Sequence, residues 1–447
     1  MKCSARGIII AAPASGSGKT LLTLGLLRHF ADRAQAVSAA KVGPDYIDPA
    51  FHTAAGGSAC LNLDAWAMRP ERIAGNLERL GCDGDLVVCE GVMGLFDGAA
   101  VPLGERTGST AEIAQLTGWS VILVVDASAQ AASAAAVVRG FATHADDVSI
   151  AGVIFNRVGS AAHEGILRQA CSAQLPEIPV LGCLPRQTSL SLPERHLGLV
   201  QAIEHPDLEA FIVGAATVVT ECIDVAAISR LAQVRATAKP TKPAIFAPFG
   251  QHVAVAADAA FAFIYAGLVE GWRALGVEVS FFSPLANETP TPMADAIYLP
   301  GGYPELHAGR LAAATKFLSG LRAAAKRGAF VFGECGGYMV LGEGLVDSDG
   351  GRHAMSGLLP LETSFAERKL HIGYRRARLA TQTPLGIVGA GYRGHEFHYA
   401  GILREADGEP LFDCANAAGE GLGPKGLVRG TVAGSFIHLI DHDPETF

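Results

Sequence analysis

A glycine-rich loop near the start of the chain constrains its fold more than any other stretch. The sequence APASGSGKT (12–20) follows a short apolar run and precedes a helical pattern. In such a strand–loop–helix unit, glycines let backbone N–H groups close around phosphate oxygens, and the helix N-terminus adds a positive end. Pro13 stands where the strict pattern has glycine, but the intact GSGKT favours a nucleotide site over a chance turn. The predicted phosphate-binding residues are Ser15, Gly16, Ser17, Gly18, Lys19 and Thr20.

Strand and helix patterns alternate through the first half. Apolar runs that predict strands lie at 7–13, 85–91, 120–128 and 151–157, with helical stretches such as 109–118 and 129–145 between them. This alternation predicts an α/β fold with a parallel sheet and helices on both of its faces. Ligands of such folds gather at the carboxyl ends of the strands, where the polar residues of interest fall here.

The length predicts two domains, because 447 residues exceed what one core usually holds. A polar stretch at 230–250, with prolines at 240 and 243, is typical of a linker, and the strand–helix pattern then restarts. Further predicted elements are a helix at 261–276 and strands at 252–258, 277–285, 294–302 and 329–337. We therefore predict domains at 1–238 and 239–447.

Carboxylates follow two of the predicted strands and make candidates for a metal site. Mg²⁺ usually takes one or two carboxylates besides a phosphate-loop hydroxyl. Glu90 comes directly after an apolar strand and faces the phosphate crevice, and Asp48 lies in KVGPDYIDP (41–49). We predict Thr20, Asp48 and Glu90 as Mg²⁺ ligands. Lys41 is either a second clamp for a phosphoryl group or a solvated lysine at a strand end.

Three other polar residues allow two interpretations each. Asp45 and Asp97 are either turn-forming acids or functional groups in the same crevice. Asn156, at the end of GVIFN, is either an ATP-binding residue that reads the adenine edge or an asparagine in a turn.

A cysteine in FVFGECGGYM (330–339) suggests a second kind of chemistry. Small residues on both sides of Cys335 permit an exposed strand-to-helix turn, the form of a nucleophile elbow. Such a thiol needs a base, and His438 follows a strand-like run near the C-terminus. Gly301 and Gly302 offer backbone N–H groups for an oxyanion. The alternative is a buried structural cysteine.

These segments resemble a known family over nearly the whole chain. ECGGYM, LPGGYPE and SFIHL resemble class I glutamine amidotransferase domains. APASGSGKT, KVGPDYIDP and EGVMGLFDG look like the ATP-binding half of the corrinoid amidases that act on cobyrinic or hydrogenobyrinic acid, and GYRGHEFHYA (391–400) is similar to a further block of that family. The resemblance implies a dethiobiotin-synthetase-like P-loop domain followed by a class I glutamine amidotransferase domain.

The resemblance also implies an activity. It is the ATP- and glutamine-dependent amidation of the a and c acetate carboxylates of a corrin, through acyl phosphates, in cobalamin (vitamin B12) biosynthesis. It implies catalytic roles for Cys335, His438, Lys41 and Asp45. It places Asp45, Tyr46, Ile47 and Asp97 near the reacting carboxylate.

The third member of the glutaminase machinery stays open. Class I enzymes usually carry a glutamate two residues after the histidine, where this chain has Ile440, with Asp441 one further on. A Cys335–His438 dyad is therefore the expectation. Glu396 and His398 are either a structural pair or line an interface.

Three rival functions remain. The first is the same chemistry on a nickel-containing sirohydrochlorin, and the second is the cobyric acid branch of the family. The third is a partitioning-type switch ATPase, which would explain only the first half. Such switches usually carry a second lysine where this chain has Ala14, and they have no use for a cysteine elbow.

The composition of the chain limits the kinds of molecule that it can bind. A net charge of −9 argues against a nucleic-acid binder, and no run approaches the roughly 18 to 20 apolar residues of a membrane span. Nine cysteines without a Cys-x-x-Cys pair or a secretory leader fit the reducing cytoplasm. We expect small-molecule partners (ATP, glutamine and a corrin polycarboxylate), with Mg²⁺ as cofactor and a homodimer as one candidate assembly.

Overall fold

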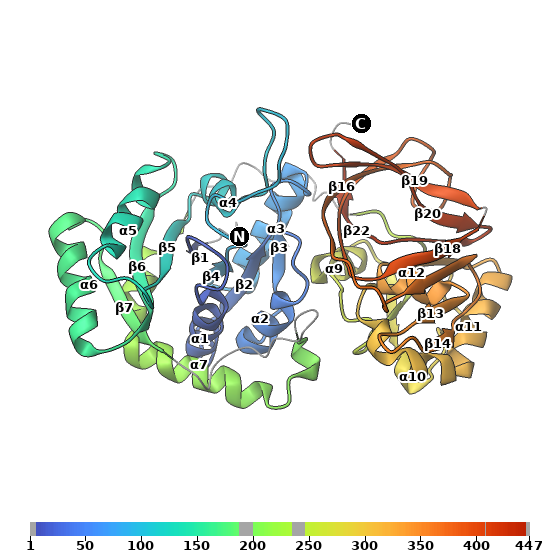
Figure 1. Cartoon of the computed structure of the whole chain (residues 1–447), viewed down its shortest axis with the longest axis horizontal. Helices are drawn as coiled ribbons and strands as arrows, with labels where there is room; N and C mark the ends of the chain where they lie inside the picture. The colour runs from blue at the N-terminus through green and yellow to red at the C-terminus, as the bar shows by residue number, and fades with distance from the viewer. Residues whose placement is uncertain (1–5, 187–199, 235–245, 407, 444–447) are drawn as a thin grey trace. The chain divides into compact units, whose positions relative to one another are not determined.

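The computed structural model describes residues 6–186, 200–234, 246–406 and 408–443. The described chain divides into two compact units (Figure 1). The first holds Met1–Trp66, Pro70–Gly98 and Arg106–Ala244, and the second holds Ile245–Phe447 with two short segments, Ala67–Arg69 and Ala99–Glu105. The predicted boundary between residues 238 and 239 lies outside the described residues.

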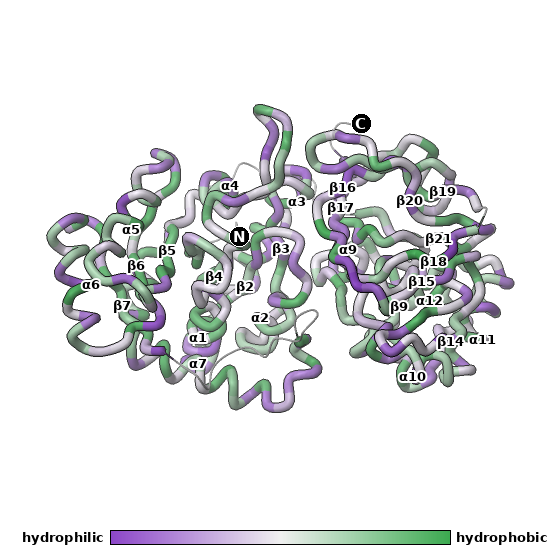
Figure 2. The backbone as a smooth tube through the Cα atoms, viewed as in Figure 1, coloured by the Kyte–Doolittle hydropathy of each residue, from purple (hydrophilic) through white to green (hydrophobic). Residues whose placement is uncertain are grey.

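The first unit is built on a parallel sheet, which confirms the predicted α/β class. Its strands run in the order β3 (Leu61–Leu63), β2 (Val37–Val42), β4 (Leu86–Glu90), β1 (Arg6–Ala11), β5 (Ser120–Asp126), β6 (Ile150–Val158) and β7 (Val180–Pro185). A short strand, β8 (Gln233–Val234), pairs antiparallel with β1. The strands β5, β6 and β7 are apolar over most of their length (Figure 2), as expected for a sheet buried on both faces.

The helices of the first unit connect these strands. They are α1 (Lys19–Ala31), α2 (Asp48–Gly56), α3 (Pro70–Asp83), α4 (Thr110–Thr117), α5 (Ala134–Thr143), α6 (Ala161–Gln174), α7 (Leu208–Cys222) and α8 (Val225–Leu231). The helix α1 packs against α2 and α7. The phosphate loop occupies the connection from β1 to α1, as the sequence predicts.

The second unit contains a mixed sheet of ten strands. Their order is β10 (Glu278–Phe282), β9 (His252–Ala256), β11 (Ala296–Leu299), β12 (Phe330–Glu334), β21 (Val432–Ser435), β20 (Gly421–Arg429), β19 (Glu409–Asn416), β16 (His371–Leu379), β17 (Gly391–His398) and β22 (Ile437–His442). Pairs from β10 to β21 are parallel, and the remaining pairs are antiparallel.

Smaller elements complete the second unit. A small sheet contains β14 (Arg352–Ala354), β13 (Gly344–Val346), β15 (Leu361–Ser364) and β18 (Gly401–Glu405). The helices are α9 (Ala266–Ala274), α10 (Ala308–Ala313), α11 (Thr315–Lys326) and α12 (Gly336–Leu341).

Two sequence-based expectations about this unit need correction. The helix predicted at 261–276 begins only at Ala266, because Phe261 and Phe263 are buried in irregular backbone and Phe263 N–H donates to Gly301 O at 3.0 Å. The antiparallel strands between residues 371 and 429 were not predicted at all.

Two further findings concern expectations from composition. Within the described residues, no helix is both long and apolar enough to cross a membrane. Cys82 is disulfide-bonded, whereas Cys60, Cys89, Cys171, Cys183, Cys222, Cys335 and Cys414 are free.

Candidate functional site

The phosphate loop is held in shape by its glycines and by a buried asparagine beneath it. Ser15 and Gly16 are exposed at its tip, and Ser17 Oγ donates to Ala14 O at 2.9 Å. Gly18 has φ 101°, and a Cβ at this position would lie 2.1 Å from Asn156 Nδ2. Only glycine fits here, because a side chain would meet both the left-handed backbone and the neighbouring carboxamide.

Asn156 supports the phosphate loop through its side-chain amide. Its Nδ2 donates to Ser17 O at 2.8 Å, and its Oδ1 accepts from the backbone N–H of Arg157 at 2.9 Å. Both polar atoms of this buried side chain are therefore engaged with backbone groups.

Lys19 begins α1 and reaches back across the loop. Its Nζ donates to Met93 O at 2.6 Å and lies 3.4 Å from Ala14 O. Burial lowers the pKa of Lys19, while the nearby Glu90 carboxylate opposes that shift. Met93 has φ 47°, an uncommon conformation for a residue with a side chain, and such conformations concentrate at functional sites.

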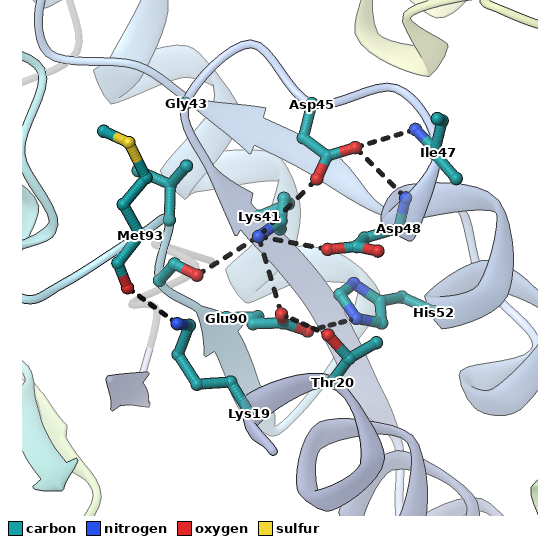
Figure 3. A network of polar contacts seen from close by, with 12 residues as sticks. Lys19, Thr20, Lys41, Gly43, Asp45, Ile47, Asp48, His52, Glu90 and Met93 are labelled. Atoms are coloured by element: carbon teal, nitrogen blue, oxygen red, sulfur yellow. Dashed lines mark hydrogen bonds and ion pairs between the residues drawn. The ribbon is translucent and has the colours of Figure 1, made fainter. Parts of the chain in front are cut away.

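Four side chains from separate elements meet beside the loop (Figure 3). The parallel register places Lys41 of β2 opposite Glu90 of β4, with their nearest charged atoms 3.5 Å apart. Glu90 Oε1 accepts from Thr20 Oγ1 at 2.8 Å, and Glu90 Oε2 lies 2.7 Å from His52 Nε2. Lys41 Nζ also donates to Gly91 O at 3.1 Å.

This cluster is charged despite its burial. Burial opposes a charge on Lys41, but Glu90, Asp48 and Asp45 outweigh it and raise the pKa of the ammonium group. Burial also opposes a charge on Glu90, yet Lys41 and the hydrogen bond with His52 lower the pKa of that carboxylate. Charges in such a low-dielectric site act more strongly on a neighbouring phosphate than they would in water.

The two acidic residues after β2 have different contacts: Asp45 stabilises the loop, and Asp48 lies beside Lys41. Asp45 Oδ1 accepts from the N–H groups of Ile47 and Asp48 at 2.8 and 3.1 Å, the contacts of a turn-forming acid. Its other oxygen lies 3.7 Å from Lys41 Nζ, and Asp48 Oδ2 lies 3.3 Å from the same atom. Burial and the adjacent Asp48 raise the pKa of Asp45 to about 6.

The remaining residues predicted near the substrate lie apart from these contacts. Tyr46 and Ile47 are buried at the entrance to α2. Asp97 is exposed, and its Oδ2 accepts from Gly94 N–H at 2.9 Å. The structure thus brings together Thr20, Lys41, Asp45, Asp48 and Glu90, while Asp97 forms its own turn.

His52 is the residue of this site that sequence reasoning missed. It is fully buried on α2, with Nε2 on Glu90 and Nδ1 3.6 Å from Cys60 Sγ. The available signal was its spacing, one helical turn after Asp48, which places both side chains on the same face of α2.

The second unit holds a thiol at a sharp turn between β12 and α12. Cys335 has φ 49° and ψ −108°, is only 2% exposed, and donates its own N–H to Ser435 O at 2.8 Å. Such a conformation costs on the order of 1–3 kcal/mol, so the surrounding structure must impose it. Burial and the nearby Glu305 raise the pKa of the Cys335 thiol, whereas hydrogen bonds from the backbone of Gly336 and Gly302 oppose that shift.

His438 of β22 lies against the same turn. A Cβ built on Gly301 would lie 2.3 Å from His438 Cε1, 3.1 Å from its Nε2 and 3.2 Å from Cys335 Cβ. The glycine at position 301 thus permits the imidazole and the cysteine to approach each other. Burial, followed by the neighbouring His395 and His398, lowers the pKa of His438 to about 3.

A cavity of about 270 Å³ is lined in part by Phe436 and Ile437, the two residues before His438. Its lining includes Tyr338, Phe436, Ile437, Glu396, His398, Glu405 and Lys425. Cys335 Sγ lies 3.5 Å from Phe397 O, on the strand that carries Glu396 and His398. Glu396 pairs with His398 at 2.8 Å, which supports the structural-pair interpretation of these two residues. His371, Glu396 and His398 lie close enough together to hold a cation. Arg375, however, already donates to Glu396 and supplies the positive charge there.

Comparisons with known proteins agree with this division into two sites. The family described as "CobQ/CobB/MinD/ParA nucleotide binding domain" matches residues 8–200, and "CobB/CobQ-like glutamine amidotransferase domain" matches residues 252–445.

Curated relatives match almost the whole chain. A protein of Rhizobium meliloti (strain 1021) named "Hydrogenobyrinate a,c-diamide synthase" is 55% identical over 97% of this chain and 99% of its own length. Proteins of the same name from Brucella anthropi and Rhodobacter capsulatus are 55% and 52% identical, over 98% and 97% of this chain and 98% of each relative. The resemblance predicted from the motifs is confirmed: the chain belongs to the hydrogenobyrinate a,c-diamide synthase family.

Proposed function

We propose that this protein amidates the a and c acetate carboxylates of hydrogenobyrinic acid in cobalamin biosynthesis, with ATP as energy source and glutamine as nitrogen donor. The observation that carries the proposal is the likeness to relatives of that name over 97–98% of the chain, which includes both sites. A phosphate site and a thiol site in one polypeptide fit a reaction that must activate an acid and also supply ammonia.

The phosphate site suits the activation step. A carboxylate does not accept ammonia at neutral pH, since its carbon is a poor electrophile. Attack of a carboxylate oxygen on the γ-phosphorus of ATP would release ADP and leave an acyl phosphate, which ammonia then attacks with loss of phosphate. Catalysis of phosphoryl transfer depends mostly on positioning and charge stabilisation. Lys19 and Lys41 would supply that charge.

The donor set beside Lys41 fits Mg²⁺. The hydroxyl of Thr20 and a carboxylate oxygen of Glu90 lie 2.8 Å apart, and both are the hard oxygen ligands that this ion prefers. We propose Thr20 and Glu90 as its protein ligands, with Asp48 as a further candidate on the other side of Lys41. When bound, the ion would neutralise charge that develops on the β- and γ-phosphates.

Replacing Glu90 with glutamine tests this assignment. We expect the Mg²⁺ concentration for half-maximal amidation to rise by about 10- to 100-fold or more, since losing a group that supports a metal already costs this much affinity. Amidation rates measured over a Mg²⁺ titration give the value. Glu164→Gln, which removes an exposed helix-surface pair with Arg168, is the matched control. Full activity of the Glu90 variant at low Mg²⁺ would rule out the ligand role.

The thiol site suits release of ammonia from glutamine. The Cys335 thiol would pass its proton to His438 while Sγ attacks the side-chain amide carbon. We propose that the backbone N–H of Gly302, whose hydrogen bond lowers the pKa of the thiol, stabilises the oxyanion. Collapse of the adduct, with a proton returned from His438, would release NH₃ and leave a glutamyl thioester. Water, deprotonated by His438, would then cleave the thioester to glutamate.

We propose the cavity lined by Phe436, Ile437 and Lys425 as the place where glutamine binds. Its carboxylate (Glu405) and its lysine (Lys425) match the opposite charges on the α-amino and α-carboxyl groups of an amino acid. Apolar walls from Phe436 and Ile437 would accompany the side-chain methylenes.

The substrate assignment is tested by offering the protein several macrocycles with ATP, Mg²⁺ and glutamine, followed by mass spectrometry. We expect hydrogenobyrinic acid to gain two amides in place of two acid groups. Cobyrinic acid and a nickel-containing sirohydrochlorin serve as competing substrates. Conversion of the nickel compound alone would overturn the proposal.

A further inference from the structure

The histidine of the thiol site needs a group that fixes its tautomer, and the position usually used for this group is apolar. Two residues after His438 stands Ile440, which is buried in the core. Asp441 is buried too, but its Oδ1 and Oδ2 pair with the guanidinium of Arg69 at 2.8 and 3.1 Å. Because Asp441 pairs with Arg69, it is not the carboxylate that orients His438.

A different carboxylate lies beside the imidazole. Glu334, the last residue of β12 and the neighbour of Cys335, is 2% exposed. Its Oε2 lies 4.0 Å from His438 Nδ1. Two donors fix it in place: Tyr298 OH donates to Oε2 at 2.6 Å, and the backbone N–H of Leu439 donates to Oε1 at 3.0 Å.

The two edges of the imidazole face different groups. The Cε1–Nε2 edge of His438 and the Cβ of Cys335 both lie against Gly301, whereas Nδ1 is the nitrogen nearest to Glu334. This is the arrangement in which a carboxylate holds the Nδ1–H tautomer and leaves Nε2 as the acceptor of a proton. A separation of 4.0 Å is longer than a hydrogen bond, but such catalytic contacts commonly tighten only when substrate is bound.

Burial explains why the two charges belong together. Burial raises the pKa of Glu334 to about 8, and burial lowers the pKa of His438 to about 3, so each charge alone is disfavoured. A pKa of about 8 leaves part of the Glu334 population ionised at neutral pH, and the imidazolium formed on proton transfer from Cys335 stabilises this ionised form. A buried carboxylate without such a role would be costly to keep.

We propose that Glu334 is the positioning residue of the glutaminase centre: it orients His438 from the strand before the nucleophile, in place of the usual carboxylate two residues after the histidine. This inference rests on the proposed glutamine hydrolysis. In the step, the Sγ–H proton moves to His438 Nε2, the Nδ1–H proton stays on His438 and faces Glu334, and the glutamate keeps its charge.

The test compares Glu334→Gln and Glu334→Asp in the full-length protein by glutamine hydrolysis and by ammonia-dependent amidation. We expect kcat for glutamine hydrolysis to fall about 10²- to 10⁴-fold in the Gln variant, with KM for glutamine little changed, by analogy with neutralising the acid of a catalytic triad. The Asp variant should recover part of the rate because it restores the charge. A purely structural role predicts the reverse order, since glutamine has the shape of glutamate.

Asp441→Asn is the matched control, because it neutralises the other buried carboxylate near His438 in the sequence. It should retain kcat for glutamine hydrolysis. A Glu334→Gln variant with kcat close to wild type, an Asp variant slower than the Gln variant, or loss of kcat in Asp441→Asn alone would each overturn the inference. Failure of the wild-type protein to hydrolyse glutamine would instead overturn the proposed function.

A second variant covers the case in which Glu334→Gln does not fold. Tyr298→Phe removes one of the two donors that fix the carboxylate but keeps its charge. We expect a smaller fall in kcat for glutamine hydrolysis, with ammonia-dependent amidation unchanged. An unchanged kcat in this variant would contradict the inference.

Discussion

Replacing Cys335 with alanine should abolish glutamine-dependent amidation while amidation with ammonium chloride continues. Without the thiol no thioester forms, and glutamine then releases no ammonia. When several catalytic residues act together, removing the nucleophile typically lowers kcat by at least about 10⁴-fold. The acid-activating site, in contrast, keeps all of its residues, so ammonia supplied from solution still reaches the acyl phosphate.

Amide formation with each nitrogen source, followed by mass spectrometry, gives the comparison. Cys414→Ala is a matched control, because Cys414 is also a buried free thiol of the second unit. Loss of both activities in the Cys335 variant, or retention of both, would contradict the division of labour.

Replacing Lys19 with alanine should abolish amidation from either nitrogen source. Lys19 begins α1 at the phosphate loop, and its Nζ donates to the backbone carbonyls of Met93 and Ala14. When ATP binds, the same N–H groups can donate to phosphate oxygens instead. The loss of one donor aimed at developing charge costs about 10²–10³-fold in kcat, and a lysine also carries a full charge. ATP-dependent amidation should therefore fall by at least this factor.

The Lys19 variant also tests whether the thiol site works independently of the phosphate site. Alkylation of Cys335 by iodoacetamide should proceed as in the wild type, since the thiol turn is unchanged. Lys316→Ala, an exposed lysine of α11, is the control for loss of a positive charge. Ammonia-dependent amidation that survives in the Lys19 variant would remove this lysine from the activation step.

Local sequence pattern determines part of the structure around the two candidate sites. The phosphate loop follows from glycines between a strand and a helix, and the structure places it at that junction. Lys41 and Glu90 end neighbouring parallel strands, so the register itself brings them together. The positive φ of Cys335 agrees with the glycines around it in the sequence, Gly333, Gly336 and Gly337.

The rest depends on contacts between distant segments, which no local pattern specifies. His52 reaches Glu90 only because α2 packs beside β2, and Tyr298 reaches Glu334 from a neighbouring strand. The place of Asn156 at a strand end is visible in the sequence, whereas its contact with Ser17 is not. The start of α9 also depends on such distant contacts. The apolar residues before Ala266 continue the helical pattern in the sequence, but in the structure they are buried in irregular backbone.

The central claim is that one site energises a carboxylate and the other liberates nitrogen for it. The most direct measurement is the stoichiometry of a reaction with hydrogenobyrinic acid, ATP, Mg²⁺ and glutamine labelled with ¹⁵N in its side-chain amide. The account predicts equal amounts of ADP, phosphate, glutamate and ¹⁵N-labelled amide at each acetate group. Unlabelled product, or consumption of glutamine without ATP turnover and amide formation, would contradict it.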